Sequence, residues 1–194
     1  MKKRRFSIGL ARAFALACCL ALVVVIPALA KNFLGGPGKD LLQGGSKADY
    51  IVGYGGNDTL KGWGGDDRIF GMDGNDSIRG GDGNDYLVGG IGQDKVWGDA
   101  GNDQILGSEG ADRLRGGGGN DDIRGGHDND VIFGDDGDDA LDGGLGIDKI
   151  YGNGGNDVLK GGPGKDTLDG GFGEDTCYAD PSDKVLNCEI VYGR

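Results

Sequence analysis

The sequence predicts an all-β chain folded as a parallel β-solenoid, and two periodic observations support this. Glycine stands at every ninth residue from Gly35 to Gly170, and an aspartate follows each of these glycines by five residues, from Asp40 to Asp175. Sixteen nonapeptide repeats therefore fill residues 35–178. Short repeats of this kind cannot bury a hydrophobic face alone, so they stack on their neighbours to form a continuous core.

Within each repeat, the residue types predict a turn followed by a short strand. Glycine at the first and fourth positions permits backbone angles with φ above zero, and the asparagine or aspartate common at the fifth position tolerates such angles too. The fourth position is glycine in fourteen repeats, the exceptions being Lys47 and Asp128. The eighth is Leu, Ile or Val in every repeat except the last, which has Cys177. We therefore expect a strand over positions seven to nine.

Two successive repeats return the chain to its starting side, so one coil takes 18 residues and sixteen repeats form about eight two-strand coils. Alternation along each strand then directs the eighth side chain inward, between two sheets, and the seventh and ninth outward. The sixth-position aspartates form two columns. The Asp40 column holds Asp40, Asp58, Asp76, Asp94, Asp112, Asp130, Asp148 and Asp166. The Asp49 column holds Asp49, Asp67, Asp85, Asp103, Asp121, Asp139, Asp157 and Asp175.

These columns predict bound calcium. Neighbouring carboxylates about 5 Å apart repel by about 3 kcal/mol at an effective dielectric near 20. A hard divalent cation bound between successive turns makes the electrostatic energy of the column favourable instead. Ca²⁺ accepts six to eight oxygens from carboxylates and backbone carbonyls, whereas Mg²⁺ demands stricter geometry and Zn²⁺ prefers nitrogen and sulfur ligands. All sixteen aspartates are therefore candidate ligands, with about fourteen full sites between coils and half-sites at the ends.

The repeat G-G-x-G-x-D-x-U-x, where U is a large apolar residue, resembles the RTX, or hemolysin-type calcium-binding, repeat. The resemblance covers residues 35–178, about three quarters of the chain. It implies a calcium-loaded β-roll whose ligands are the sixth-position aspartates together with carbonyl oxygens of the turns. The repeats with Lys47 and Asp128 at position four depart from the pattern, so the sites that border those two turns are the ones in question.

The predicted core is small for the length of chain that it must order. Each repeat contributes one inward apolar side chain, while ordering the backbone costs conformational entropy at every residue. Bound metal must then contribute folding energy, as it does in other metal-dependent domains. We therefore expect a disordered calcium-free chain and a rigid roll when calcium is bound.

The first thirty residues predict a secretory signal peptide. Four basic residues at positions 2–5 precede an apolar run over residues 13–26, and the segment ends in Ala28-Leu29-Ala30. A retained membrane anchor is the alternative. Removing residues 1–30 leaves 15 Lys plus Arg against 32 Asp plus Glu, a net charge of 15 − 32 = −17. Such a surface disfavours nucleic acid and anionic lipid as partners, and we expect an extracellular protein with no membrane span.

The ends of the repeat array are a four-residue lead, residues 31–34, and a C-terminal cap, residues 179–194. The lead is too short to cover the first coil, so an exposed strand edge is expected there. Cys177 and Cys188 predict a disulfide that staples the cap in an oxidising compartment. A two-cysteine metal site is the alternative, disfavoured because His127 is far away in sequence and no third soft ligand is nearby.

The outward positions predict two different faces. One face gathers an apolar patch of Tyr50, Val52, Phe70, Tyr86, Val88 and Leu106. The other gathers a basic stripe of Lys61, Arg79, Lys95, Arg113 and Arg115 around Trp97. The patch could dock a partner, but strands favour such residues anyway. The stripe could bind an acidic polysaccharide, or it could simply be a solvated face.

The sequence offers little for catalysis. His127 is the single histidine, and neither H-E-x-x-H nor G-x-S-x-G occurs. We therefore predict no enzyme and no cofactor other than Ca²⁺, and a secreted calcium-binding protein. The alternative is an extracellular adhesive or structural module that presents the roll faces to a matrix polysaccharide or a protein partner. Asp85→Ala is expected to weaken folding more than Asp183→Ala, because Asp183 lies outside the repeats.

Overall fold

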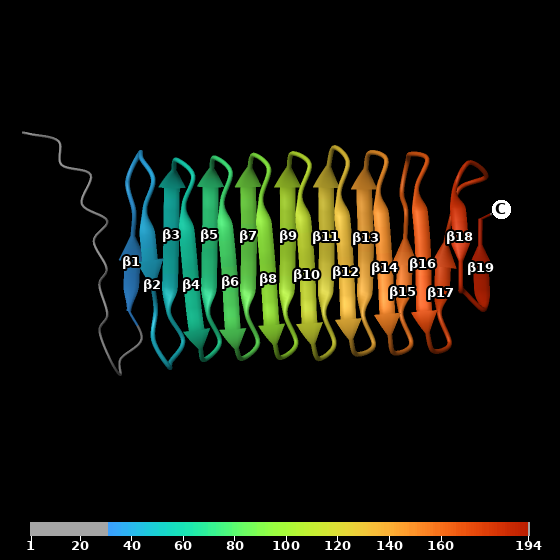
Figure 1. Cartoon of the computed structure of the whole chain (residues 1–194), viewed down its shortest axis with the longest axis horizontal. Helices are drawn as coiled ribbons and strands as arrows, with labels where there is room; N and C mark the ends of the chain where they lie inside the picture. The colour runs from blue at the N-terminus through green and yellow to red at the C-terminus, as the bar shows by residue number, and fades with distance from the viewer. Residues whose placement is uncertain (1–30, 194) are drawn as a thin grey trace, which may run out of the picture.

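The computed structural model describes residues 31–193, so the predicted signal peptide lies outside the described residues. The described chain forms nineteen β-strands and no helix. The strands lie in two parallel sheets that the chain visits alternately, and the coils follow one another along the long axis, from β1 (Asn32–Leu34) at one end to β19 (Ile190–Tyr192) at the other (Figure 1). The prediction of an all-β parallel β-solenoid is confirmed.

Each sheet takes every second strand. The ten-stranded sheet, sheet A, contains β1, β3 (Tyr50–Gly55), β5 (Arg68–Asp73), β7 (Tyr86–Ile91), β9 (Gln104–Glu109), β11 (Asp122–His127), β13 (Ala140–Leu145), β15 (Val158–Lys160), β17 (Thr176–Tyr178) and β19. The nine-stranded sheet, sheet B, contains β2 (Leu41–Gln43), β4 (Thr59–Gly64), β6 (Ser77–Asp82), β8 (Lys95–Ala100), β10 (Arg113–Gly118), β12 (Val131–Asp136), β14 (Lys149–Gly154), β16 (Thr167–Phe172) and β18 (Lys184–Leu186).

The strand register confirms a coil of 18 residues, because paired residues within the repeats are 18 apart, as in Leu87↔Ile105 of sheet A and Ile78↔Val96 of sheet B. The solenoid has about nine turns rather than eight. The short lead adds a strand to sheet A only, where Phe33 of β1 pairs with Ile51. The first repeat strand, β2, has no neighbour beyond it in sheet B, so strand edges are exposed at this end as expected. At the other end β18 and β19 add one more strand to each sheet.

The core is a single row of eighth-position side chains between the two sheets. Fourteen of the fifteen Leu, Ile and Val side chains at this position are buried, as in Leu60 and Ile132, the exception is the partly buried Leu42, and Cys177 joins the row. Phe33 closes the row at the N-terminal end, and the partly buried Val185 and Val191 pack against it at the other. The inward direction predicted for this position is therefore correct.

Most strands are longer than the sequence pattern predicts. Between β3 and β14 each strand has six residues and continues through the first three positions of the following repeat, as β8 does over Lys95–Ala100. The strands β1 and β15 stop after three residues, shortly before Pro37 and Pro163. Proline lacks the N–H group that a strand ladder needs, which explains these two short strands.

The positive φ predicted for the fourth-position glycines is confirmed at most of these positions, but that predicted for the first-position glycines was wrong. Positive φ occurs at the second and fourth positions, as in Gly90 (φ 120°) and Gly92 (φ 143°), and not at the first. Side chains other than glycine adopt it at the second position too, for example Trp63 (φ 84°) and Met72 (φ 78°). This second residue turns the backbone at the end of each strand. The first-position glycine meets a different requirement, described below.

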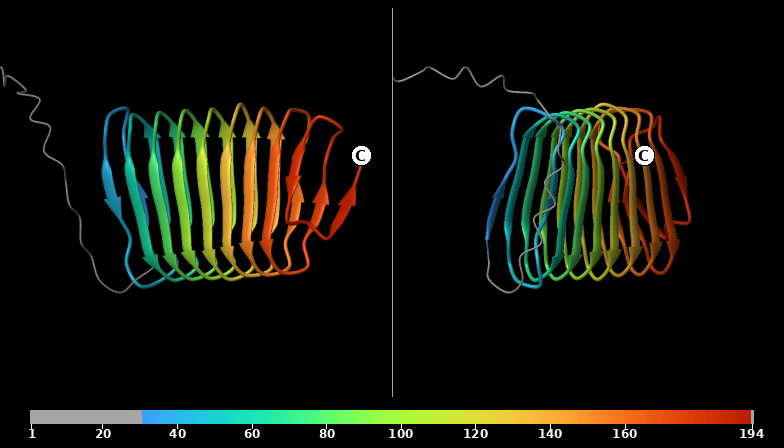
Figure 2. Two further views of the ribbon diagram at one scale, coloured as in Figure 1. Left: turned by 45° about the vertical axis from the view of Figure 1, so that its right-hand side comes forward. Right: turned by 60° about the vertical axis from the view of Figure 1, so that its left-hand side comes forward.

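The fifth-position residues do not have positive φ, so the role predicted for them was wrong. Their side-chain oxygens instead accept a hydrogen bond from the backbone N–H of the fifth position in the next coil. The N–H of Asn102 donates to Oδ1 of Asn84 at 2.8 Å, and that of Asn120 donates to Oδ1 of Asn102 at 2.8 Å. The ladder ties each turn to the next along the edges of the solenoid, where the turns stack (Figure 2).

Candidate metal centre

The sixth-position aspartates form two continuous columns, one along each row of turns. In each column Oδ1 of one aspartate accepts the backbone N–H of the aspartate one coil earlier, as in the 2.8 Å bond from Asp85 to Asp103. All sixteen predicted aspartates lie in these columns, and all except the half-buried Asp40 have at most 5% of their surface exposed. The structure therefore brings together the residues that the period of the sequence selects.

The second carboxylate oxygen has no partner in most of the column. Fourteen of the aspartates have a buried Oδ2 without a hydrogen bond, namely Asp58, Asp67, Asp76, Asp85, Asp94, Asp103, Asp112, Asp121, Asp130, Asp139, Asp148, Asp157, Asp166 and Asp175. Burying a charged oxygen without a partner is unfavourable, and such an oxygen in a native fold indicates a missing ligand. The first members of the columns differ, because Oδ2 of Asp40 and of Asp49 accepts an N–H from its own turn.

A backbone carbonyl lies beside all of these oxygens except Oδ2 of Asp166, next to the first-position glycine. A Cβ atom built on Gly98 would overlap both Oδ2 of Asp103 and, at 2.6 Å, the carbonyl oxygen of Gly116 in the next coil. The same pair of oxygens meets the first-position glycine of each repeat from Gly35 to Gly152. Glycine is needed here because any side chain would fill the space where a carboxylate and a carbonyl converge.

The electrostatics of the columns favour a bound cation. Loss of water on burial raises the pKa of Asp103 and of Asp112 to about 7, and that of Asp130 to about 8. The hydrogen bond from the preceding aspartate N–H lowers these pKa values, and repulsion from neighbouring carboxylates raises them further. Ionised carboxylates in these positions therefore need a compensating positive charge.

The oxygen-only donor set fits calcium. Within residues 31–193 no three Asp, Glu, His or Cys side chains converge on one point, so a cation between coils must take most of its ligands from backbone carbonyls. Ca²⁺ binds mixed sets of carboxylate and carbonyl oxygens with flexible geometry. The orphaned Oδ2 atoms and the adjacent carbonyls are such a set, and they would hold the ion between successive turns.

The two repeats that depart from the pattern behave differently. Asp128 adopts a φ of 72°, so its turn keeps a left-handed fourth residue like the glycines around it. Lys47 does not have positive φ, and it belongs to the turn of Asp49, whose Oδ2 is already bonded to Gly45 N at 2.7 Å. The turn of Asp40, which has Gly38 at the fourth position, shares both features, because Gly38 lacks positive φ and Oδ2 of Asp40 accepts the N–H of Gly36. The difference therefore belongs to the first coil rather than to Lys47, and the turn at Asp128 is unaltered.

Two carboxylates at the C-terminal end of the columns were missed. The N–H of Asp166 donates to Oδ1 of Asp183 at 2.9 Å, and the N–H of Asp175 donates to Oε2 of Glu189 at 2.8 Å. The signal was present, because residues 183–186 and 189–192 repeat the carboxylate-x-apolar-x order of positions six to nine. Asp183 lies outside the repeats but closes the Asp40 column, so Asp183→Ala is not an inert control for folding.

A parallel two-sheet solenoid with buried carboxylate columns along its turns defines the class of calcium-binding β-rolls. Five segments that together span residues 34–177 match the family described as RTX calcium-binding nonapeptide repeat (4 copies), over residues 34–69, 64–96, 97–130, 115–150 and 142–177. The chain therefore belongs to this family, and its repeats bind calcium. No curated protein matches the chain.

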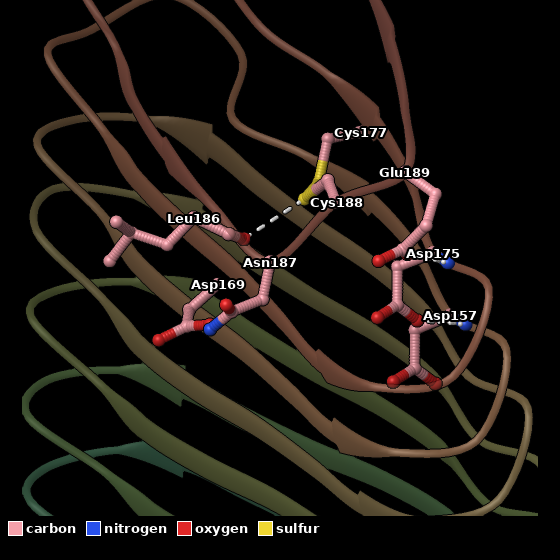
Figure 3. Close-up of a disulfide and its surroundings, with 8 residues drawn as sticks. All are labelled: Asp157, Asp169, Asp175, Cys177, Leu186, Asn187, Cys188 and Glu189. Atoms are coloured by element: carbon pink, nitrogen blue, oxygen red, sulfur yellow. Dashed lines mark hydrogen bonds between the residues drawn. A yellow bond between two sulfur atoms is a disulfide. The ribbon is translucent and has the colours of Figure 1, made fainter.

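The predicted disulfide is confirmed. Cys177 and Cys188 are bonded, with their Cα atoms 6.0 Å apart, and the bond joins the last repeat to the cap (Figure 3). A disulfide indicates a non-reducing environment. Among the described residues no helix is long and apolar enough to cross a membrane.

Acid should favour the calcium-free roll. Burial raises the folded pKa of column aspartates such as Asp94 and Asp103 to about 6 and about 7, above the value of 3.8 that is ordinary for an aspartate, so the folded chain binds more protons than the unfolded chain between these pH values. This proton uptake stabilises the folded, calcium-free chain. The stabilisation is fully present below pH 3.8 and is lost as the pH rises through about 6 to 8. Calcium-depleted protein should therefore gain β-sheet circular dichroism on titration from about pH 8 to about pH 4.

Light scattering must accompany this titration, so that precipitation near the isoelectric point is not mistaken for folding. A calcium-free chain that gains β structure only as the pH rises would contradict the assignment of these raised pKa values.

Proposed function

We propose that this is a secreted protein whose repeats fold around about fourteen Ca²⁺ ions into a rigid β-roll, with calcium as a structural ion. The observation that carries the proposal is the set of fourteen buried aspartate Oδ2 atoms without a partner. Each lies in a turn where a calcium ion would satisfy it. Coordination, rather than turnover of a substrate, is then the chemistry of the protein.

Three further observations support secretion. Residues 1–30 have the pattern of a signal peptide, the disulfide between Cys177 and Cys188 suits an oxidising compartment, and the calcium concentration outside cells is high enough for weak sites to fill. Extracellular calcium modules have dissociation constants of about 10⁻⁴ to 10⁻³ M. A chain of this kind would stay unfolded while calcium is scarce and fold after export.

Asp85→Asn tests the role of the columns. Asparagine keeps an oxygen that can accept the N–H of Asp67, which Oδ1 of Asp85 does at 2.7 Å, but it removes the charge at the buried Oδ2. We expect the loss of at least one calcium ion and of about 2.7 kcal/mol of stability, the contribution of one site at a hundred times its Kd. Native mass spectrometry would count the ions, and calcium titration followed by circular dichroism would give the folding midpoint.

The matched control is Asp122→Asn, because Asp122 faces outward and pairs only with Arg124, at 3.2 Å, with 48% of its side chain exposed. Exposed pairs of this kind contribute about 0–1 kcal/mol. Equal calcium midpoints and equal ion counts for the two variants would contradict the assignment of the column aspartates as ligands.

An adhesive role is the second candidate, and the apolar patch of sheet A favours it. Phe70 on β5 contacts Tyr50 on β3 and Tyr86 on β7, with ring centroids 5.5 and 5.9 Å apart. Tyr50 and Tyr86 keep 40% and 39% of their surface exposed. Three adjacent aromatic rings on a flat sheet are a surface on which a sugar ring or an apolar side chain of a partner could stack.

The basic stripe of sheet B supports this role less well, because its arginines are partly neutralised by the protein itself. Arg79 pairs with Asp99 at 3.2 Å, and Arg115 forms a two-bond ion pair with Asp135. A glycan array probed with the calcium-loaded protein, with and without chelator, would separate the two candidates. Calcium-dependent binding that Phe70→Ser abolishes would establish adhesion, and no binding to any glycan would leave calcium binding as the function.

A further inference from the structure

The C-terminal cap continues the turn geometry of the repeats in an abbreviated form. Leu186, at the end of β18, pairs with Asp169, which is a ninth-position residue, so Asn187 takes the place of the first-position glycine of a following repeat. Ile190 pairs with Thr176, a seventh-position residue, so Glu189 takes the place of the sixth-position aspartate. Only Cys188 separates Asn187 from Glu189, where a repeat has four residues.

The backbone carbonyl of Asn187 occupies the place of a glycine carbonyl. In the preceding coil, Gly152 faces Oδ2 of Asp157 and the carbonyl oxygen of Gly170. At the last repeat, Gly170 faces Oδ2 of Asp175 and the carbonyl oxygen of Asn187 in the same arrangement. The pair of converging oxygens that marks each turn therefore extends beyond residue 177, where the matches to the repeat family end.

The cap holds this carbonyl in place by the backbone conformation of Asn187 and by two contacts. Asn187 adopts a φ of 46°, which asparagine tolerates, and its side-chain Nδ2 donates a 2.6 Å hydrogen bond to Oδ1 of Asp169. The next residue, Cys188, is bonded to Cys177, whose side chain is fully buried in the core. The disulfide thus fixes the residue that lies between Asn187 and Glu189.

The carboxylate of Glu189 continues the Asp49 column. Figure 3 shows Asp157, Asp175 and Glu189 following one another along the turns, beside the disulfide. Oε2 of Glu189 accepts the N–H of Asp175 at 2.8 Å, as Oδ1 of Asp175 accepts the N–H of Asp157 at 2.8 Å. Independently, Oδ2 of Asp175 has no partner although the residue has no exposed surface.

We propose that the disulfide-held cap completes a calcium site of its own, formed by the Asp175 carboxylate, the Asn187 carbonyl and the Glu189 carboxylate. The proposal rests on the proposed function, since it assumes that calcium fills the same pairs of oxygens in the repeats. The cap site takes two of its ligands, from Asn187 and Glu189, from outside the repeats. The binding of one calcium ion therefore depends on the disulfide. The last member of the Asp49 column is then a full site.

The Asp40 column ends without such a site, and this asymmetry provides a control. The three atoms nearest to a Cβ on Gly161 all belong to Asp166, so no carbonyl of the cap approaches as that of Asn187 does. The carboxylate of Asp183 is also occupied locally, because its Oδ2 accepts the N–H of Asp180 at 2.6 Å. Asp183 therefore closes its column by hydrogen bonds alone.

Native mass spectrometry of residues 31–194 in saturating calcium tests the proposal. Glu189→Gln keeps an oxygen that can accept the Asp175 N–H, so the variant should fold, and it should bind one calcium ion fewer than the wild-type protein. Asp183→Asn should bind the wild-type number. Reduction of the disulfide in the wild-type protein should also remove one ion, because it frees Asn187 and Glu189, and circular dichroism would verify that each calcium-loaded sample is folded.

The failures of the two proposals can be told apart. If the wild-type protein binds calcium and Glu189→Gln binds the same number of ions, the cap site is wrong and the proposed function stands. If Glu189→Gln and Asp183→Asn lost the same number of calcium ions, the cap site would also be wrong, because equal losses would indicate general loosening of the cap. A wild-type protein that binds no calcium would instead refute the proposed function.

Discussion

Excess EGTA should unfold the mature chain, residues 31–194, to a disordered state. The fourteen buried Oδ2 atoms have no hydrogen-bond partner among the described residues, and without a bound cation the ionised carboxylates repel their neighbours along both columns. A site held at a hundred times its Kd contributes about 2.7 kcal/mol. Four or five such sites already match the stability of about 5–15 kcal/mol that a typical domain has in total.

Circular dichroism and the hydrodynamic radius measure this transition. We expect a β-sheet spectrum and a compact radius in calcium, and a coil spectrum with an expanded radius in EGTA, with recovery when calcium is restored. Mg²⁺ at the same concentration should not restore the fold, because it requires stricter octahedral geometry and keeps its waters. A chain that retains its β spectrum and compact radius in excess EGTA would remove the basis of the proposed function.

The period of the sequence was sufficient to predict the coil, the core and the columns. A spacing of 18 residues between equivalent positions dictates that Ile105 lies beside Leu87 and Asp103 beside Asp85, and the structure has both pairs. Such predictions succeed because they depend only on position within the repeat. Cys177, the eighth residue of the last repeat, lies in the core, and its predicted disulfide reaches from there to the cap.

The features that were mispredicted depend on contacts between coils. Gly98 was interpreted through its own backbone angles, but its role is set by Asp103 and by Gly116 of the next coil. Asn84 was likewise given a conformational role, although its side chain accepts an N–H from Asn102. Residue propensities describe a single turn, and these residues serve the stacking of one turn on another.

The two carboxylates of the cap were missed for a related reason. The turn from Asn187 to Glu189 is shorter than a repeat turn, so the nine-residue period breaks even though the coil geometry continues. A search for the period therefore ends at residue 178. A search for a carboxylate two residues before an inward apolar residue would have found Asp183 with Val185 and Glu189 with Val191.

Gly98→Ala should abolish a calcium site and destabilise the roll strongly. Gly98 lies in β8 without positive φ, so alanine can adopt its backbone conformation, and the effect comes from contact alone. The added methyl group would overlap Oδ2 of Asp103 and the carbonyl oxygen of Gly116. Overpacking of this kind costs about 1–3 kcal/mol, and loss of the ion adds about 2.7 kcal/mol, so we expect a total of about 4 kcal/mol or more.

Gly118→Ala is the matched control, because Gly118 also lacks positive φ and a Cβ atom on it would meet nothing within 4 Å. The same chemical change there should alter stability by no more than about 0.5 kcal/mol and leave the ion count unchanged. Calcium titration followed by circular dichroism, with ions counted by native mass spectrometry, compares the pair. If Gly98→Ala bound as many ions as Gly118→Ala at the same calcium midpoint, the space beside the first-position glycine would not be where calcium binds, and the requirement for glycine there would be one of backbone packing alone.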